Sequence, residues 1–476
     1  GLVYIILTEK SVKWMYVALI LIVVLFVFLK NKSLLTRTSM MVLLVVLFLA
    51  QQVLMSNDSR KITIELYQTT LKTLNDSSYK SSILNKKITH MTQKSSDPLN
   101  RLDYFSYYAL NSPFIYHYNG TSLYSSIFDG DILKYYDQTL QINMPVDKNS
   151  TYRYLGNRAN LMSLWDVQDR LRHPNDLNMP YGFKKKELIT DKKDQWIHSV
   201  NTMNYPSAHI TNKKYDTKEL KSPLDREQAM LNGVVFNNKT QGNTPFKPNT
   251  NLLSNANQSL NNADWIDSNH LKVNQNNGGV TFNLPKSIVK NYKDMYVEMD
   301  VELLSPDKEH KVGVNEYSQE RNRLSYKYRR FVSPVTMRTK SSSHLNITMS
   351  KGTYRFKVKG IYGEDYKTLK NASQQLKTVK VKKESNGFTI TKQQRDHGYL
   401  VLPMVYAEGM HATADGKPVK VQQGNGIMTT IPVKEGQTTI RLTYTPPYFY
   451  LLITISIIGS ILSIIFTYYV KRKREK

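Results

Sequence analysis

Paired carboxylates are the first side chains in this sequence whose type and spacing could do chemistry. Asp129 and Asp131 flank Gly130, and two close carboxylates can move a proton or hold a divalent cation. The same spacing also suits the start of a helix, where one acid caps the first turn and the other favours the positive end of the helix dipole. We favour the helix start.

Two further acidic sets follow along the chain. The first alternates on a predicted strand and is expected to form a solvated face, whereas the second shares a predicted helix with two arginines and is expected to form surface ion pairs. The strand set is Glu298, Asp300 and Glu302, and the helix set is Asp166 and Asp169 with Arg170 and Arg172. Neither set predicts a catalytic site.

A tyrosine-rich stretch, 104–124, points to carbohydrate, because sugars bind through aromatic faces combined with a few fixed hydrogen-bonding groups. We expect five residues in and near it to contact an acceptor or a sugar: Arg101, Asn111, Tyr124, Ser125 and Arg158. The alternative is that the tyrosines fill a domain core or rest on a lipid headgroup layer. Both interpretations remain open at this stage.

Common enzyme motifs are missing from the sequence. There is no G-x-S-x-G, no G-x-x-x-x-G-K-[ST], no H-E-x-x-H and no EF-hand loop, and the 10 histidines are scattered without ligand spacing. We therefore expect no metal site from these motifs and no evident cofactor, and a divalent-metal requirement is unknown.

Three apolar segments are long enough to cross a bilayer: 12–29, 39–55 and 447–470. Basic residues set their direction, because cytoplasmic loops retain Lys and Arg. The loop 30–38 and the tail 471–476 are both basic, so we place them in the cytoplasm and residues 56–446 outside. The prediction is a multi-pass protein of a bacterial cell membrane.

The outer region divides into two expected parts, an extracytoplasmic mixed helical and Tyr-rich subdomain at 56–231 and a β-rich part at 232–446. Leu161, Leu164, Val167 and Leu171 keep helical spacing. Strands are predicted at 295–303, 399–406, 410–414, 419–422, 427–433 and 438–444, with a hairpin turn at Asp415-Gly416. The fold class is transmembrane helices plus a large extracytoplasmic α+β region with a β-sandwich, jelly-roll-like C-terminal part.

The outer region is strongly basic. The chain carries a net charge of +27, and about +4 belongs to each flanking segment, which leaves about +19 for residues 56–446. A polyanionic partner, either anionic membrane lipid or a phosphate-rich wall polymer, would account for this charge, and no nucleic acid is expected outside the membrane. The alternative is a composition that makes every surface basic. The absence of Cys favours a bacterial envelope protein over a eukaryotic ectodomain.

Several stretches resemble the YfhO family of bacterial polytopic membrane proteins. They are Leu110-Asn-Ser-Pro, Leu123-Tyr-Ser-Ser, Leu155-Gly-Asn-Arg-Ala-Asn-Leu-Met-Ser-Leu-Trp-Asp-Val, Gly398-Tyr-Leu-Val-Leu-Pro, Asp415-Gly-Lys and Ile440-Arg-Leu-Thr-Tyr-Thr-Pro-Pro. Their order and the closing apolar segment carry the resemblance.

The resemblance implies a glycosyltransferase of the GT-C type. Such an enzyme takes a sugar from an undecaprenyl-phosphate carrier and places it on lipoteichoic acid or a related wall polymer of Gram-positive bacteria. The catalytic residues are unknown and expected N-terminal to Gly1, because such enzymes keep them in early outer loops, so the chain resembles the C-terminal portion of a longer protein. The alternative function is a non-catalytic, membrane-anchored accessory protein that binds carbohydrate or teichoic acid.

Overall fold

The computed structural model describes residues 81–474, except 95–96, 106–110, 128, 143, 145–149, 153, 177, 192–193, 207, 237–243 and 331–332, together with six isolated helical positions before residue 58. Residues 1–80 and 81–476 form two compact units. The predicted span 12–29 lies outside the described residues, as does the span 39–55 apart from four helical positions.

The second unit begins with a helix packed on a mixed sheet. Helix α5 (Ser82–Lys94) is capped by the Ser81 hydroxyl, which accepts from the Leu84 N–H at 2.9 Å. Leu84 and Ile88, one helical turn apart, are fully buried and cluster with Leu171. The sheet has the order β1 (Arg101–Tyr104), β4 (Val167–Arg172), β6 (Asp194–Asn201), β5 (Phe183–Asp191), with β1 and β4 parallel.

Short elements connect β1 to β4. They are α6 (Ser112–Tyr116), β2 (Leu123–Tyr124), α7 (Gly130–Lys134), the π-helical turn η1 (Tyr135–Thr139), β3 (Thr151–Tyr152) and α8 (Ala159–Leu164). Asp129 caps α7 by accepting from the Asp131 N–H at 2.8 Å, which confirms the helix start expected there.

The helix predicted through Leu171 ends early. Asp166 adopts a positive φ of 53° directly after α8, so the chain turns and Val167 begins strand β4. The surface pairing predicted for Asp166, Asp169, Arg170 and Arg172 on a helix is therefore wrong, and Arg170 and Arg172 are buried. Apolar residues at 161, 164, 167 and 171 fit a helix by spacing alone, although the last two belong to a strand.

A helix and two parallel strands complete this part of the chain. After strand β7 (His209–Thr211), the chain forms β8 (Lys214–Asp216), the short helix η2 (Thr217–Glu219), α9 (Pro223–Asn232) and β9 (Val234–Phe236). Strands β8 and β9 pair in parallel. Ser222 and Asp225 form a reciprocal capping box at the start of α9.

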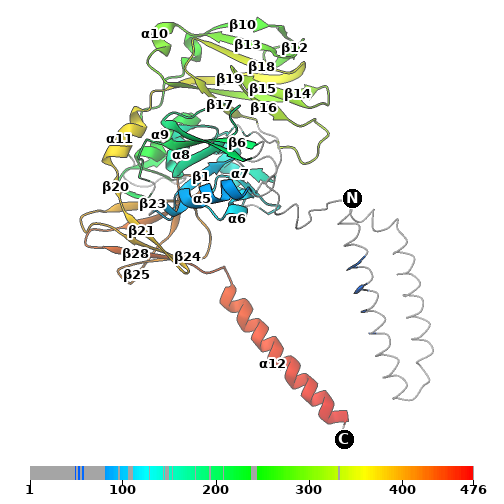
Figure 1. Ribbon diagram of the computed structural model, residues 1–476, viewed down its shortest axis with the longest axis vertical. Coiled ribbons are helices and arrows are strands. Elements are labelled where there is room, and N and C mark those ends of the chain that lie inside the picture. Colours follow the sequence, from blue (N-terminus) through cyan, green and yellow to red (C-terminus); the bar gives the residue numbers. More distant parts are fainter. Residues whose placement is uncertain are drawn as a thin grey trace, which may run out of the picture. The chain divides into compact units, whose positions relative to one another are not determined.

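Two five-stranded sheets then enclose one apolar core, forming a sandwich (Figure 1). Its elements are η3 (Leu252–Asn255), β10 (Asn257–Asn261), β11 (Ala263–Trp265), β12 (His270–Val273), β13 (Gly278–Asn283), α10 (Lys286–Val289), β14 (Asp294–Ser305), β15 (His310–Val314), β16 (Tyr317–Arg321), β17 (Val335–Lys340), β18 (His344–Met349) and β19 (Gly352–Glu364). The sheet orders are β10-β13-β18-β15-β16 and β11-β12-β19-β14-β17.

Strand β14 confirms the alternation predicted for residues 295–303, since Met295, Val297 and Met299 are fully buried in this core. Its other face is not uniformly wet. Glu298 is 7% exposed and accepts a hydrogen bond from Gln141 Nε2 at 2.9 Å. The solvated face predicted for Glu298, Asp300 and Glu302 is therefore wrong at Glu298, because the segment after η1 covers that end of the strand.

A second sandwich follows helix α11 (Lys367–Gln375). Its remaining strands are β20 (Lys377–Thr378), β21 (Lys380–Glu384), β22 (Gly387–Thr391), β23 (Gly398–Val405), β24 (Met410–Ala414), β25 (Lys417–Val419), β26 (Gln422–Gly424), β27 (Met428–Val433) and β28 (Thr439–Tyr444). The sheets run β20-β7-β23-β27-β26 and β21-β22-β28-β24-β25 around a shared apolar core. Strand β7 thus joins this sandwich from far earlier in the sequence.

Four of the five strands predicted between 399 and 444 are confirmed. Residues 419–422 instead end β25 and begin β26, which belong to different sheets. Asp415 and Gly416 both have positive φ, 45° and 80°, as the predicted tight hairpin turn requires. The β-sandwich part of the predicted fold class is observed, and jelly-roll-like topology stays a prediction.

Helix α12 (Phe449–Arg474) ends the described chain (Figure 1). Its segment Phe449–Val470 is long and apolar enough to cross a membrane, and none of the residues in its most apolar stretch is buried within the protein. This confirms the third predicted span by length and composition.

Candidate functional site

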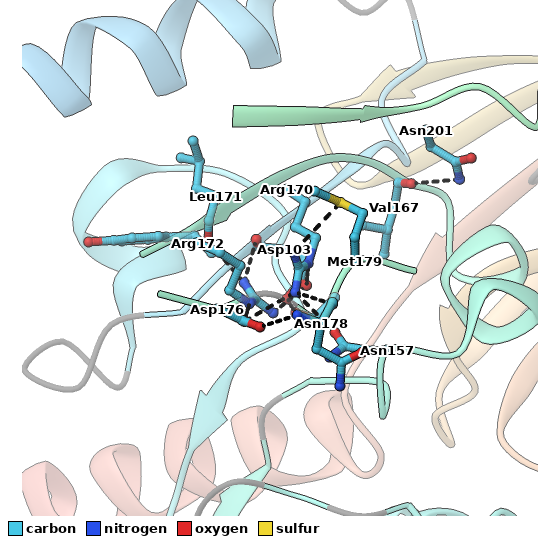
Figure 2. A network of polar contacts seen from close by, with 12 residues as sticks. Asp103, Asn157, Val167, Arg170, Leu171, Arg172, Asp176, Asn178, Met179 and Asn201 are labelled. Atoms are coloured by element: carbon cyan, nitrogen blue, oxygen red, sulfur yellow. Dashed lines mark hydrogen bonds and ion pairs between the residues drawn. The ribbon is translucent and has the colours of Figure 1, made fainter. Parts of the chain in front are cut away.

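Strand β4 is held in place by a buried network of two arginines and two aspartates (Figure 2). Arg172 donates to the Asp103 carboxylate and, at 2.9 Å, to the Asp103 carbonyl oxygen. Asp176 Oδ2 lies 3.2 Å from Arg170 Nη2 and 3.3 Å from Arg172 Nε. Asn157 also accepts from Arg170, at 3.2 Å. The network is electrically balanced and leaves the strand little freedom to shift.

The charges in this network stabilise one another against burial. Burial alone would raise the pKa of Asp103, but the Arg172 and Arg170 guanidinium groups and the Thr121 hydroxyl hold it below its usual value. Burial and the neighbouring Arg172 charge lower the pKa of Arg170 to about 10. Asp103 thus remains ionised between two charged arginines at neutral pH.

The opposite face of the same sheet forms one wall of a cavity of about 390 Å³, most of whose lining residues are polar or charged. Side chains alternate along β4, so Asp169 faces the cavity while Arg170 and Arg172 face the buried network. Helix α5 supplies the other wall. The lining residues, called here the α5 cavity, are Lys87, His90, Met91, Asn100, Asp169, Lys186, Glu187, His198 and Val200.

His198 lies between two carboxylates in the wall of the α5 cavity. Its Nε2 is 2.7 Å from Asp169 Oδ1 and its Nδ1 is 3.3 Å from Glu187 Oε1. Glu187 also forms an ion pair with Lys87, with Nζ and Oε2 2.6 Å apart. The Lys87 ammonium, assisted by His198 and opposed by partial burial, lowers the pKa of Glu187. The His198 ring is therefore fixed in orientation by Asp169 from β4 and Glu187 from β5, and Lys87 from α5 holds Glu187 in turn.

This arrangement combines groups that bind hydroxyls with groups that bind anions. Asp169 and Glu187 are partly accessible, at 15% and 34% of their side-chain surface, and can accept hydrogen bonds from hydroxyl groups. Lys186 and His90 are exposed at the rim and can contact phosphate or carboxylate. The chemistry of the cavity suits a ligand that carries hydroxyls and negative charge.

Four of the five residues predicted to contact a sugar lie in one neighbourhood of the fold. Asn111 binds Tyr124 through two backbone contacts, its Nδ2 donating to the Tyr124 carbonyl at 3.0 Å and its Oδ1 accepting from the Tyr124 N–H at 2.7 Å. Ser125 follows and bonds locally to Ile127. Arg101 lines a separate cavity of about 150 Å³ that also includes Leu123 and Trp165.

Arg101 is engaged by the protein itself. Its Nη1 donates to the Trp165 carbonyl at 3.0 Å, and its guanidinium group lies 5.2 Å from the centre of the Trp165 ring. Burial lowers the pKa of Arg101 to about 10, partly offset by Asp166. Tyr124 is 42% exposed. A sugar-contact role for this group of residues stays a prediction.

Arg158 is placed differently, with 0% of its side chain exposed. It donates to Glu227 Oε1 at 3.0 Å and to the carbonyl oxygens of Leu140, Gln141 and Thr336 at 2.7, 3.0 and 2.7 Å. These contacts join α8 and α9 to strand β17 of the first sandwich. Arg158 therefore has no surface for a ligand and does not join the other predicted residues.

Most described tyrosines of the 104–124 stretch fill a core. Tyr104, Tyr116 and Tyr118 are each less than 10% exposed and pack under α5. This favours the core interpretation for them. The residues of the α5 cavity were missed, because His198, Glu187 and Asp169 meet only through the pairing of β4, β6 and β5, which residue spacing does not reveal. Among the described residues, no group of three or more His, Cys, Asp or Glu side chains could hold a metal ion.

Comparisons with known proteins give a family match across almost the whole chain. Residues 2–456 match the family described as bacterial membrane protein YfhO. The YfhO protein of Bacillus subtilis (strain 168) is 31% identical over 417 residues, which cover 86% of this chain and 47% of that protein. The chain therefore spans about half the length of this curated relative.

Solved structures show only faint likeness. The arabinofuranosyltransferase AftD from Mycobacteria is 10% identical over 34% of this chain and 13% of its own, with a TM-score of 0.15. The binding domain of botulinum neurotoxin DC is 9% identical over 41% of this chain and 91% of its own, with a TM-score of 0.14. At such TM-scores neither structure carries an inference.

Proposed function

Because the chain belongs to the YfhO family of bacterial membrane proteins, we propose that it is the acceptor-binding part of a membrane glycosyltransferase of the GT-C type. The whole protein moves a sugar from an undecaprenyl-phosphate carrier to lipoteichoic acid or a related wall polymer outside the membrane. The catalytic residues of that protein lie elsewhere in its sequence, and no cofactor is assigned here.

The observation that carries the proposal is His198, held between Asp169 and Glu187 in the wall of the α5 cavity. A polyol phosphate offers hydroxyls for the two carboxylates and phosphates for Lys186 and His90. His198 is 1% exposed and uses both ring nitrogens to hold the two carboxylates, so the fixed carboxylates can orient one hydroxyl without a large entropy cost at binding. The cavity thus suits an acceptor hydroxyl that must be presented for transfer.

The charge of the outer region supports the same partner. Residues 56–446 carry about +19, and such a surface attracts a polyanionic polymer from a distance of roughly 8 Å at physiological ionic strength. Helix α12 would hold this region beside the membrane lipids, where a lipid-linked sugar is delivered. We place residues 56–446 outside the cell because the basic loop 30–38 and the basic tail 471–476 favour the cytoplasm.

The test is reconstitution of the full-length gene product in vesicles with an undecaprenyl-phosphate-linked sugar and a polyglycerol-phosphate acceptor. Sugar transfer without any other protein is the expected result. Binding of the polymer without transfer, under conditions in which a cell extract transfers the sugar, would contradict the transferase and favour the alternative of a non-catalytic accessory protein.

A pair of lysine variants tests the site itself. Lys186 lines the α5 cavity. Lys184 lies on the same strand and is also exposed, but it does not line the cavity. Lys186→Glu should raise the KM for polymer at least fivefold, because it places a negative charge beside the phosphates, and Lys184→Glu should change it less than twofold. Equal effects of the two variants would reject the α5 cavity as the acceptor site.

A further inference from the structure

A second polar cavity, of about 230 Å³, lies at the edge of the second sandwich. Strand β7, the end of α9, the end of α11 and the turn between β22 and β23 meet there. We call it the β7 cavity, and its lining residues are Ile210, Thr211, Asn212, Lys213, Asn232, Ala372, Gln375, Leu376, Lys377, Arg395, Asp396 and His397. It shares no residue with the α5 cavity.

One carboxylate is buried in the wall of the β7 cavity, and one of its oxygens is held by an ion pair without a well-aligned hydrogen bond. Asp396 is 3% exposed, and its Oδ1 accepts no hydrogen bond from the described residues. Lys377 Nζ lies 3.3 Å from that oxygen, and the Lys377 side chain is 54% exposed. The ion pair with Lys377 offsets part of the cost of burying this oxygen, and a ligand hydroxyl can add the well-aligned hydrogen bond that the oxygen lacks.

The rim of the β7 cavity is positively charged. Lys213, Lys377 and Arg395 are all exposed, so three permanent cations face one carboxylate. His397 is paired with Glu435, its Nδ1 lying 3.1 Å from Oε1. Because Lys377 forms an ion pair with Asp396, the positive charges of Lys213 and Arg395 are the ones that can bind the anionic group of a ligand.

Neutral hydrogen-bonding groups complete the lining. Asn212, Asn232 and Gln375 contribute amides, which can donate and accept at once. Thr211 contributes a hydroxyl, which lies 3.4 Å from the Asn232 carbonyl oxygen. Amides beside a carboxylate suit a ligand with several hydroxyls, whereas an apolar ligand would leave them unpaired.

We propose that the β7 cavity binds a phosphate-bearing polyol or sugar unit. Arg395 and Lys213 contact the phosphate oxygens, and Asp396 accepts a hydrogen bond from a hydroxyl. Inorganic phosphate alone has no carbon-bound hydroxyl that could reach Asp396 while its other oxygens contact Arg395 and Lys213, and an uncharged sugar would leave the cations unused. The assignment of this unit to a wall polymer or a lipid-linked sugar rests on the proposed function, whereas the binding itself rests on the local geometry.

Calorimetric titration of the whole chain in detergent tests this binding, with glycerol 3-phosphate, inorganic phosphate and glycerol as probes. The Lys186→Glu background weakens binding at the α5 cavity, and the Arg395 and Asp396 variants then assign the remaining heat to the β7 cavity. Glycerol 3-phosphate should bind at least tenfold more tightly than either inorganic phosphate or glycerol. Equal affinity for glycerol 3-phosphate and inorganic phosphate would overturn the proposal.

Two variants and one control locate the site. Arg395→Gln should weaken glycerol 3-phosphate binding about tenfold. Asp396→Asn should reduce the ratio of the affinity for glycerol 3-phosphate to the affinity for inorganic phosphate. Arg441→Gln is the matched control, because Arg441 is an exposed arginine on β28 of the same sandwich, outside the cavity, and should change affinity less than twofold. Since Arg395 is exposed, its variant tests binding without a folding defect, and an unchanged affinity would overturn the proposal.

Two further probes distinguish the sources of the ligand. Tighter binding of glycerophosphoglycerol, a phosphodiester, would support the cavity as a wall-polymer site. Tighter binding of a sugar 1-phosphate would support it as a site for the lipid-linked sugar. A raised KM for polymer in Lys186→Glu, with glycerol 3-phosphate binding at the β7 cavity intact, would show that the two proposals stand or fall separately.

Discussion

Removing the Arg158 guanidinium should destabilise the folded region 81–446 more than any surface charge change of the same type. Arg158 Nη1 and Glu227 Oε1 are 3.0 Å apart, with both side chains 0% exposed. Burial already raises the pKa of Glu227, and Arg158 opposes that rise. Arg158→Met keeps most of the side-chain volume but removes the positive charge beside buried Glu227, which then keeps the Tyr296 hydroxyl at 3.0 Å. It also removes the guanidinium donors of the Leu140, Gln141 and Thr336 carbonyl oxygens, of which Gln141 keeps the Thr336 N–H at 2.8 Å. The expected cost is about 3–5 kcal/mol.

Lys311 and Glu320 provide a control with the same geometry and different burial. Their N···O distance is also 3.0 Å, but their side chains are 59% and 75% exposed. Lys311→Met should therefore cost less than about 1 kcal/mol, because water replaces the lost partner. Arg158→Met with Glu227→Gln should recover part of the loss, since the uncompensated charge is gone.

Urea unfolding of the detergent-solubilised chain, followed by tryptophan fluorescence, measures these differences. Trp165 is 6% exposed and donates to the Tyr135 hydroxyl at 2.9 Å in the core next to α8, so its emission reports loss of this region. A midpoint for Arg158→Met within error of that for Lys311→Met would refute the reasoning from burial.

Three further changes should alter stability in stated directions. Burial lowers the pKa of His310 to about 4, so the contribution of its neutral ring to the free energy of unfolding is present above pH 6.5 and is lost as the pH falls toward 4. The melting temperature of His310→Gln should therefore fall less than that of the wild type between pH 7 and 4.5. Burial raises the pKa of Glu364 to about 7, so the folded form retains a proton that the unfolded form loses. Stability should fall as the pH rises from 4.5 to 7, and Glu364→Gln should remove that slope in the same melting series. Gly387 has φ +137° and an added Cβ would lie 1.9 Å from the Leu442 carbonyl oxygen, whereas Gly436 has φ +82° and open space; Gly387→Ala should cost on the order of 3 kcal/mol and Gly436→Ala about 1 kcal/mol in urea unfolding.

Local patterns in the sequence predicted the features that depend on neighbouring residues. The cap at Asp129, the turn at Asp415-Gly416 and the alternation along β14 each follow from residue types within a few positions. The apolar helix α12 follows from composition alone. These features need no knowledge of what packs against them.

Features that depend on distant partners were missed or misplaced. Arg158 was predicted to contact an acceptor or a sugar, but Glu227 and three carbonyl oxygens engage its guanidinium group and make its burial possible. His198 carried no signal, since its two carboxylates come from other strands. Val167 and Leu171 fit two periodicities, and the positive φ at Asp166 decided between them.

The most direct test of acceptor binding at the α5 cavity is the KM for polyglycerol phosphate in the reconstituted sugar-transfer reaction, measured for Lys186→Glu and Lys184→Glu. A rise of at least fivefold for Lys186→Glu, with kcat retained and Lys184→Glu within twofold of the wild type, is the predicted result. An unchanged KM in both variants, in a reaction that transfers sugar, would contradict it.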